Sequence, residues 1–340
     1  MNERLLPSYP LFVKDPNFSL WSPAELLNSV NVKSWWGETK KIYGFIKTDE
    51  GTFCFLGNGA EDFSECGIKN AEQLSVSITA FSTDYVFQAG KTKLKLKFVS
   101  PLLPTNFNII SLPVCYLEYE VSGVGFAELS FFVNRAVAYN DIPQTPDKRV
   151  KCGVLRGKKY ETAFIGLSRQ MPLSSCNDLI GADWGYYYLT GDETYALDEK
   201  SLAVYLACNG KDFSVNEEER YIGSVNKRKN GRILFAYDDL VSIEYFGTYL
   251  KGYYLEKHTI AEALAYTCEN ADKIDAKLKN FDEELKSRAE PFGKEYLNVL
   301  YASLRQSVGA HKLVRDKEGQ VLFLSKECNS NGCIATVDVS

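Results

Sequence analysis

The spacing of hydrophobic residues changes once along this chain of 340 residues, near His258, and this change constrains the fold more than any other feature. Between about residues 70 and 250, apolar and polar residues alternate in short runs separated by turn residues, as in half-buried β-strands. Beyond His258, apolar residues recur every three or four positions, as on one face of an α-helix. Strands followed by helices predict a mainly β protein with C-terminal α structure.

The alternating region is predicted to form a large antiparallel β-sandwich, because ten or more short strands follow one another without an intervening helix. An earlier strand pair, at 42–46 and 52–56, flanks a turn signal at Asp49-Glu50-Gly51. The strands predicted after residue 70 are 74–80, 85–87, 92–99, 111–121, 127–133, 162–167, 184–189, 202–207, 231–237 and 240–246.

Two helices are predicted after the sandwich. Pro291 and Gly293 end the first, and the second starts near Tyr296 and is expected to end near Leu313-Val314. The apolar stripe of the first helix consists of Ile260, Leu264, Cys268, Ala271, Ile274, Leu278, Phe281 and Leu285. This helix can lie across the sandwich or lead into an all-helical domain, and the sequence leaves both arrangements open.

These patterns predict four parts. They are an aromatic-rich N-terminal segment (1–65), the antiparallel β-sandwich (66–255), a linker helix (256–292) and the first part of an α/α helical-hairpin domain (293–340). The first part holds Trp21, Trp35 and Trp36, which form either the core of a small unit or a platform on which a sugar stacks, the core being the commoner arrangement.

Composition excludes several classes of protein. The net charge of −5, from 39 basic and 44 acidic residues, argues against a nucleic-acid partner, and three lysines at 93, 95 and 97 fit the solvated face of a strand. The chain has no apolar run of about 18 residues and no N-terminal signal sequence, so we expect no membrane span and a cytoplasmic protein. With two histidines and an odd count of nine cysteines, we expect free thiols, no metal and no cofactor.

The residues with the most chemical potential lie in the last fifteen positions. Glu327 and Asp338 are an acidic pair, and Asn329 and Asn331 lie between them. Hydrolysis of an amide needs a base, a proton donor and hydrogen-bond donors for the oxyanion, and cleavage of a glycosidic bond also uses two carboxyl groups. The alternative is a salt-bridged turn followed by a hairpin turn at Asn331-Gly332.

A second candidate lies on the sandwich. Asp183 and Trp184 can contribute a carboxylate and an aromatic wall to a substrate site, although a buried tryptophan that opens a core strand is the commoner arrangement. The chain has no glycine-rich phosphate loop and no serine nucleophile elbow, which disfavours a nucleotide enzyme and an α/β-hydrolase.

The strand-like residues 335–339 are followed by no turn, helix or polar tail. We therefore expect a fragment whose next domain is missing, inactive by itself and able to associate through an exposed apolar end. The residues expected at that end are Tyr296, Leu300, Leu304, Val308, Leu322, Phe323, Leu324 and Val337.

Several short motifs, in this order and spacing, resemble the glutaminase A family. They are Pro10 to Trp21 with its Pro-x-Phe-Ser-x-Trp pattern, Trp35-Trp36-Gly37, Phe55-Leu56-Gly57, Asp183 to Tyr186, Ile243 to Gly247, Arg305-Gln306, Ala310 to Leu313, and Lys326-Glu327 through Val339. The resemblance implies an N-terminal segment, a β-sandwich and a catalytic domain of helical hairpins, a plan shared with many sugar-cleaving enzymes.

The resemblance also implies a function. Members of the family are described as glutaminases, which hydrolyse L-glutamine to L-glutamate and ammonia. We therefore predict a glutaminase-like amidohydrolase with a small-molecule substrate, with Glu327 and Asp338 as catalytic residues and with Asn329, Asn331 and the Asp183-Trp184 pair as substrate-binding residues. A glycoside-hydrolase-type enzyme and a non-catalytic binding or scaffold module are the alternatives.

Overall fold

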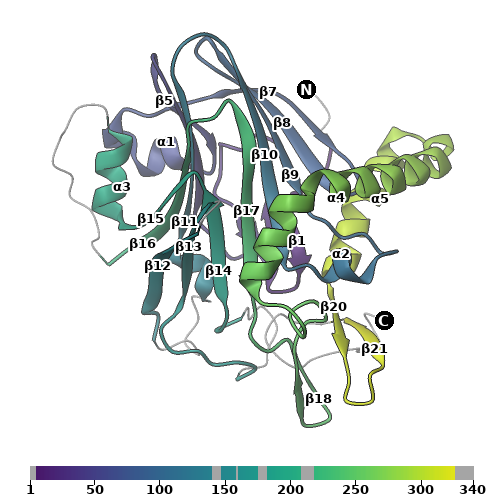
Figure 1. Ribbon diagram of the computed structural model, residues 1–340. Coiled ribbons are helices and arrows are strands. Elements are labelled where there is room, and N and C mark those ends of the chain that lie inside the picture. Colours follow the sequence, from purple (N-terminus) through teal and green to yellow (C-terminus); the bar gives the residue numbers. More distant parts are fainter. Residues whose placement is uncertain (1–4, 140–146, 158–159, 175–181, 208–217, 326–340) are drawn as a thin grey trace.

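The computed structural model describes residues 5–139, 147–157, 160–174, 182–207 and 218–325 (Figure 1). These residues form two large β-sheets that pack face to face, with two long helices and a β-hairpin at the C-terminal side. The predicted fold class, mainly β with a large antiparallel sandwich and C-terminal α structure, is confirmed.

One sheet has eight strands and is antiparallel throughout. In spatial order they are β12 (Val150–Arg156), β13 (Glu161–Leu167), β14 (Tyr186–Gly191), β17 (Asn230–Asp238), β10 (Val114–Ser122), β9 (Thr92–Val99), β8 (Ser82–Ala89) and β7 (Glu72–Ile78).

The facing sheet has six strands and is antiparallel except for the short pair β5–β6. In spatial order they are β15 (Glu193–Asp198), β16 (Arg220–Asn226), β11 (Ala127–Asn134), β4 (Ile42–Thr48), β5 (Gly51–Leu56) and β6 (Lys69–Asn70). The predicted turn between β4 and β5 is present, with Thr48 opposite Gly51.

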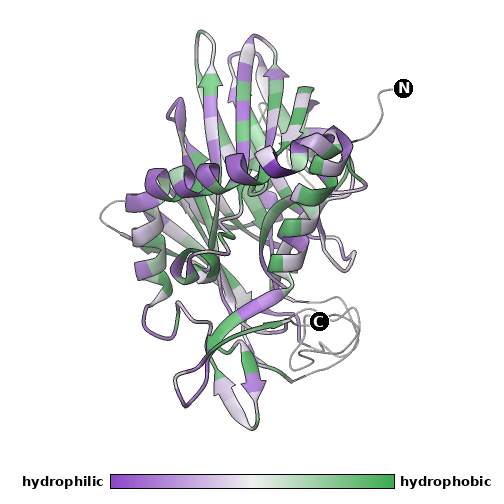
Figure 2. Cartoon of the chain, turned by 90° about the vertical axis from the view of Figure 1, so that its right-hand side faces the viewer, coloured by the Kyte–Doolittle hydropathy of each residue, from purple (hydrophilic) through white to green (hydrophobic). Residues whose placement is uncertain are grey.

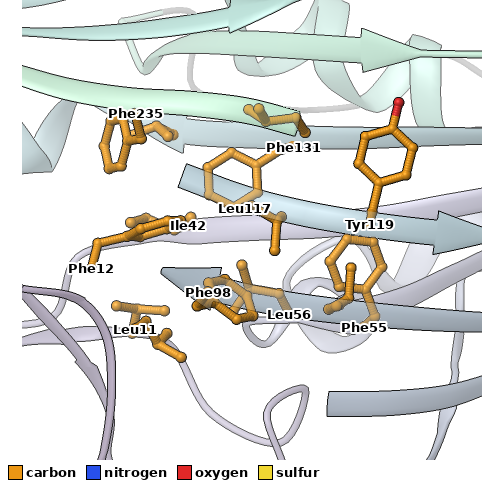
Figure 3. Packing of buried hydrophobic residues seen from close by; sticks show 14 of the residues in the cluster. Leu11, Phe12, Ile42, Phe55, Leu56, Phe98, Leu117, Tyr119, Phe131 and Phe235 are labelled. Carbon is orange, nitrogen blue, oxygen red and sulfur yellow. The ribbon is translucent and has the colours of Figure 1, made fainter. Parts of the chain in front are cut away.

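Aromatic side chains dominate the core between the sheets (Figure 3). Phe131 of the six-stranded sheet packs edge-on against Phe235 of the eight-stranded sheet, and Phe12 of the N-terminal segment contacts both rings. Period-two alternation produces this layer, because every second residue of each strand points inward.

The N-terminal segment is part of the sandwich rather than a separate unit. It forms a small sheet of β1 (Tyr9–Asp15), β2 (Phe18–Ser22) and β3 (Lys33–Ser34), while the next two strands, within the predicted 1–65 segment, belong to the six-stranded sheet. Trp21 is buried, Trp35 is partly exposed, and the Trp36 indole donates to Glu38.

A helix of 30 residues, α4 (Ile260–Ala289), lies across the outer face of the eight-stranded sheet and packs on β10 and β17 (Figure 2). Thr259 and Glu262 form a capping box at its start. Of the two arrangements that the sequence left open for this helix, the structure has the one across the sandwich.

The second long helix, α5 (Lys294–Gly309), packs against β1. It ends earlier than predicted, because the residues expected in its last turn form β20 (His311–Arg315), which pairs with β21 (Val321–Ser325). Gly319 makes this hairpin turn possible, with φ of +87°.

Two other strand predictions were wrong, the first entirely and the second in part. The run 202–207 is helical, in α3 (Glu199–Leu206), because the Asp198 carboxylate accepts a hydrogen bond from the Ser201 N–H and caps a helix there. The run 240–246 forms only the short strand β18 (Ile243–Tyr245), paired with β19 (Thr248–Leu250), since Leu240 has a left-handed backbone with φ of +57°. The remaining short helices are α1 (Gly59–Asp62), η1 (Ser64–Cys66), α2 (Phe107–Ser111), η2 (Arg135–Ala138) and η3 (Glu290–Phe292).

The apolar residues expected to be exposed at the C-terminal end are mixed in the structure. Tyr296 and Phe323 are exposed, and Val337 lies outside the described residues. The others are partly buried against neighbouring elements: Leu300, Leu304, Val308, Leu322 and Leu324.

Two further predictions concern cysteines and membranes. The cysteines recorded as free thiols are Cys54, Cys66, Cys115, Cys152 and Cys268, while Cys176, Cys208, Cys328 and Cys333 lie outside the described residues. Among the helices of the described ranges, none is long and apolar enough to cross a membrane.

Candidate functional site

The four predicted site residues of the tail, Glu327, Asn329, Asn331 and Asp338, lie outside the described residues. The described chain leads to them through β21, whose last residue, Ser325, is buried and pairs with His311. The described region closest to the tail in sequence is therefore the place where β20 and β21 meet the sandwich.

The structure places the other two predicted residues at this same end of the sandwich, in its interior. Asp183 and Trp184 are each only 1% exposed. The Trp184 indole donates a hydrogen bond of 3.0 Å to the carbonyl of Val241, and its own carbonyl accepts one of 2.7 Å from the Tyr237 hydroxyl. Trp184 thus supports the loop that follows β17 from the interior of the sandwich.

Gly185 allows this contact. Its φ is +89°, and a Cβ atom there would lie 2.6 Å from the carbonyl oxygen of Asp238. A side chain at this position would push the Trp184 turn away from the end of β17.

A buried ion cluster lies next to the loop that follows β17. The Lys312 amine, on β20, lies 2.7 Å from a carboxylate oxygen of Asp15 and 2.7 Å from one of Asp239. The side chains of these three residues, which we call the junction cluster, are 12%, 6% and 2% exposed in that order. Burial alone would lower the pKa of Lys312, but the two carboxylates outweigh it and raise that pKa above its usual value. The amine is therefore held as a cation and is not available as a base.

Local turns aim both carboxylates at Lys312. One oxygen of Asp15 accepts the backbone N–H groups of Asn17 and Phe18, in the turn between β1 and β2, and its other oxygen faces the amine. Asp239 precedes Leu240, whose left-handed backbone is uncommon for a branched residue. The surrounding contacts hold that strained turn in place.

A second buried lysine lies beside the cluster. The Lys14 amine donates hydrogen bonds of 2.7 and 2.9 Å to the carbonyls of Pro101 and Ile109. Burial lowers its pKa to about 7, so that the neutral amine is populated near neutral pH. A perturbed lysine is often a functional group, and its chemical use depends on access.

Access here is narrow. A cavity of about 20 Å³ lies between Lys14, Lys312, His311 and Phe323, which is enough space for about one water molecule. The His311 ring stacks on Phe323 at 4.5 Å between centroids. This arrangement holds β20 and β21 together, and the part of the chain that the structure describes leaves no room for a substrate beside Lys14 and Lys312.

Arg305 anchors α5 to the sandwich in a similar way. Its guanidinium is fully buried, and burial lowers its pKa to about 9. It donates to four oxygens of the strand β8, the turn before it, and β1: those of Pro10, Thr79, Ser82 and the Thr83 hydroxyl, at 2.9 to 3.2 Å. Two buried cations, Arg305 and Lys312, therefore join this C-terminal part to the sandwich.

An open cleft of about 730 Å³ lies elsewhere, on the outer face of the eight-stranded sheet beside α4. Cross-strand ion pairs cover its floor: Glu118 on β10 is opposite both Lys97 and Arg232. Arg232 also reaches Asp275 on α4, at 3.2 Å.

The carboxyl groups of this cleft have unequal pKa values. Burial raises the pKa of Asp275 to about 6, and its carboxylate accepts a hydrogen bond of 2.6 Å from Tyr116. Burial opposes ionisation of Glu118 too, but Lys97 and Arg232 bring its pKa below the usual value. The acidic and basic side chains neutralise one another, and their ion pairs hold α4 on the eight-stranded sheet.

Sequence reasoning missed the junction cluster and the buried arginine. Asp15, Arg305 and Lys312 all lie within motifs that carry the family resemblance, but a lysine or arginine in a short motif gives no sign of being buried. Lys312 precedes Leu313-Val314, two adjacent apolar residues that the sequence pattern predicts at the end of a helix and that lie in β20 instead. In the ranges that the structure describes, no group of three metal-binding side chains occurs.

Three family models match the chain in order. A domain of unknown function (DUF4964) matches residues 2–64, a second one (DUF5127) matches 81–288, and the glutaminase A six helical-hairpin domain matches 293–340. The junction cluster joins the first and last of these ranges to the one between them, because Asp15, Asp239 and Lys312 lie one in each.

One curated relative shares its name with the last of these domains. Glutaminase A of Aspergillus oryzae is 24% identical over 382 aligned positions, which cover 98% of this chain and 52% of that protein. The chain thus spans about half the length of this relative. Among solved structures, one described as a kojibiose phosphorylase from the human microbiome is similar over 80% of this chain and 32% of its own, with a TM-score of 0.32 and 9% identity.

Proposed function

We propose that this chain, which belongs to the glutaminase A family, forms the β-sandwich and the beginning of the helical-hairpin domain of an amidohydrolase that converts L-glutamine to L-glutamate and ammonia. The observation that supports it most is the ordered match of three family domains, together with similarity to a glutaminase A over 98% of the chain.

In this proposal the tail carries the chemistry. One carboxylate of the pair Glu327 and Asp338 takes a proton from water as the water oxygen attacks the carbon of the side-chain amide. The other group of the pair, in its protonated carboxylic acid form, gives its proton to the amide nitrogen as the C–N bond breaks, so that ammonia leaves and a carboxyl group remains. The amides of Asn329 and Asn331 donate hydrogen bonds to the substrate and to the tetrahedral oxyanion.

In this proposal the described residues contribute to the chemistry by holding in place the hairpin that precedes the tail. Ser325, two residues before Glu327, is buried in a hairpin that Lys312 ties to Asp15 and Asp239. Misplacement of a catalytic group by about 1 Å can cost about 100-fold in rate, so a rigid base for the tail matters. In this proposal Asp183 and Trp184 belong to the substrate-binding side of the site, and the indole of Trp184 supports the loop after β17.

The test is ammonia release from L-glutamine by the whole gene product, with a panel of glycans assayed in parallel. Glu327→Gln and Asp338→Asn should each lower ammonia release by about 100-fold or more, because general acid–base catalysis contributes about 10²–10⁴. Glu120→Gln, which changes a half-exposed carboxylate on the sandwich, is the matched control and should have no effect. Release of sugar without ammonia would instead assign the glycoside-hydrolase alternative, and neither product would favour a binding or scaffold module.

A further inference from the structure

The β18–β19 hairpin ends in an aromatic tip, most of which is exposed. The tip consists of Tyr245, Phe246 and Tyr249. Phe246 is 93% exposed and Tyr249 is 66% exposed. Exposed aromatic residues gathered at one point of a surface mark a contact site more often than isolated ones do.

The backbone of the tip adds a second observation. Phe246 has φ of +44° and Gly247 has φ of +73°, as in the tight two-residue turns in which both central residues are left-handed. Asparagine or glycine suits the first of these positions, whereas a phenylalanine there is strained. The chain thus keeps an aromatic ring where both solvent exposure and backbone geometry oppose it.

The base of the hairpin already contacts the C-terminal region. Ile243 and Leu250 form a small apolar cluster with Val314 of β20, and Leu322 and Leu324 of β21 pack against it. Gly252 also bridges to Val314. Both hairpins project from the same end of the molecule (Figure 1).

All the β20 and β21 residues in that contact lie within the range matched by the six-hairpin domain. The aromatic tip continues the same contact outward, away from the sandwich. We propose that the tip is the docking surface for further helical hairpins of that domain, with Phe246 as the anchor that inserts between them. This inference rests on the proposed function, in which such a domain follows.

Two substitutions test it, each made in residues 1–340 and in the whole gene product. Phe246→Asn removes the ring and supplies a residue that accepts the left-handed backbone. Val124→Asn is the matched control, since Val124 is 96% exposed in the turn between β10 and β11. That turn lies at the opposite end of the sheet, where the Val121 N–H bonds to Lys229, just before β17 starts.

The readouts are hydrogen exchange of amides 243–250 and the melting temperature. In the wild type, these amides should exchange at least tenfold more slowly in the whole gene product than in residues 1–340. Phe246→Asn should abolish this difference and lower the melting temperature of the whole product, while it leaves that of residues 1–340 unchanged or higher. Val124→Asn should change neither readout.

Equal exchange in the two wild-type proteins would overturn the inference. So would a dimer of residues 1–340 that Phe246→Asn dissociates, because the occupant would then be a second copy. Ammonia release by the wild-type whole product is measured separately. Protection of the tip without ammonia release would refute the proposed function and support the docking surface. Ammonia release without protection of the tip would support the proposed function and refute the docking surface.

Discussion

Replacing Lys312 by methionine removes the amine and keeps most of the side chain's volume. The amine lies 2.7 Å from each of two carboxylates whose side chains are 6% and 2% exposed. Lys312→Met would leave both carboxylates buried without their cation. Removing one partner from a buried ion pair costs about 3–5 kcal/mol, and we expect a loss in this range in the free energy of unfolding.

An exposed ion pair supplies the comparison. Lys95 and Glu120 lie 3.2 Å apart on the sheet surface, with side chains 51% and 55% exposed. Such pairs contribute about 0.2–1 kcal/mol, so Lys95→Met should cost no more than that. Both variants lose the same amine, and the difference between them isolates the effect of burial.

The assay is urea unfolding followed by tryptophan fluorescence, which Trp184 makes sensitive to the loop that carries Asp239. Without the amine, each buried carboxylate lacks its cation, and adding a proton to it removes an unpaired buried charge. The variant should therefore recover part of its stability, relative to the wild type, at acidic pH. A loss equal to that of Lys95→Met, or a loss that does not depend on pH, would refute the reasoning.

Three further results are expected. Burial lowers the pKa of Lys14 to about 7, so the folded state binds fewer protons than the unfolded state between pH 7 and 9. Over this range the free energy of unfolding of the wild type should therefore rise by about 2 kcal/mol more than that of Lys14→Met. Arg305→Met removes the donor of four hydrogen bonds and should cost at least about 3 kcal/mol, with faster hydrogen exchange in α5, whereas Gln306→Met, on the exposed side of that helix, should stay within about 0.5 kcal/mol. In thiol labelling of the native protein, exposed Cys268 should react fast and buried Cys115 only on unfolding, and the opposite order would contradict the fold.

The parts of the fold that the sequence predicted correctly are those that one residue period specifies over a long stretch. The stripe from Ile260 to Leu285 became α4, and the alternating runs became the strands of two sheets. The failures were short segments, such as α3, where eight residues carry too few apolar positions to separate strand from helix and a single aspartate cap decides.

The candidate site was less predictable because its parts are far apart in the sequence. Asp15, Asp239 and Lys312 meet only in the folded chain, and each alone looks like a surface charge. For Trp184 the sequence creates the opposite impression. An aromatic residue beside an acid suggests the wall of a substrate site, whereas the folded chain shows an indole that is buried and hydrogen-bonded to Val241.

The junction cluster is better explained by its effect on the register of β20 than by its contribution to the stability of the fold. Buried ion pairs are often no more stabilising than apolar residues of the same size, but β20 gains a unique position from this one. Neighbouring residues of a strand point to opposite sides, so a slip by one residue would place Leu313 against the carboxylates and Lys312 in the position of His311, on the other side of the strand. We therefore expect the triple variant Lys312→Met, Asp15→Asn and Asp239→Asn to be more stable than Lys312→Met alone, since no buried charge is left unpaired, yet to release ammonia more slowly than the wild type in the whole gene product, because β21 no longer holds the tail in one position. Full activity in this variant, with its stability restored, would show that the cluster does not set the register on which the tail depends.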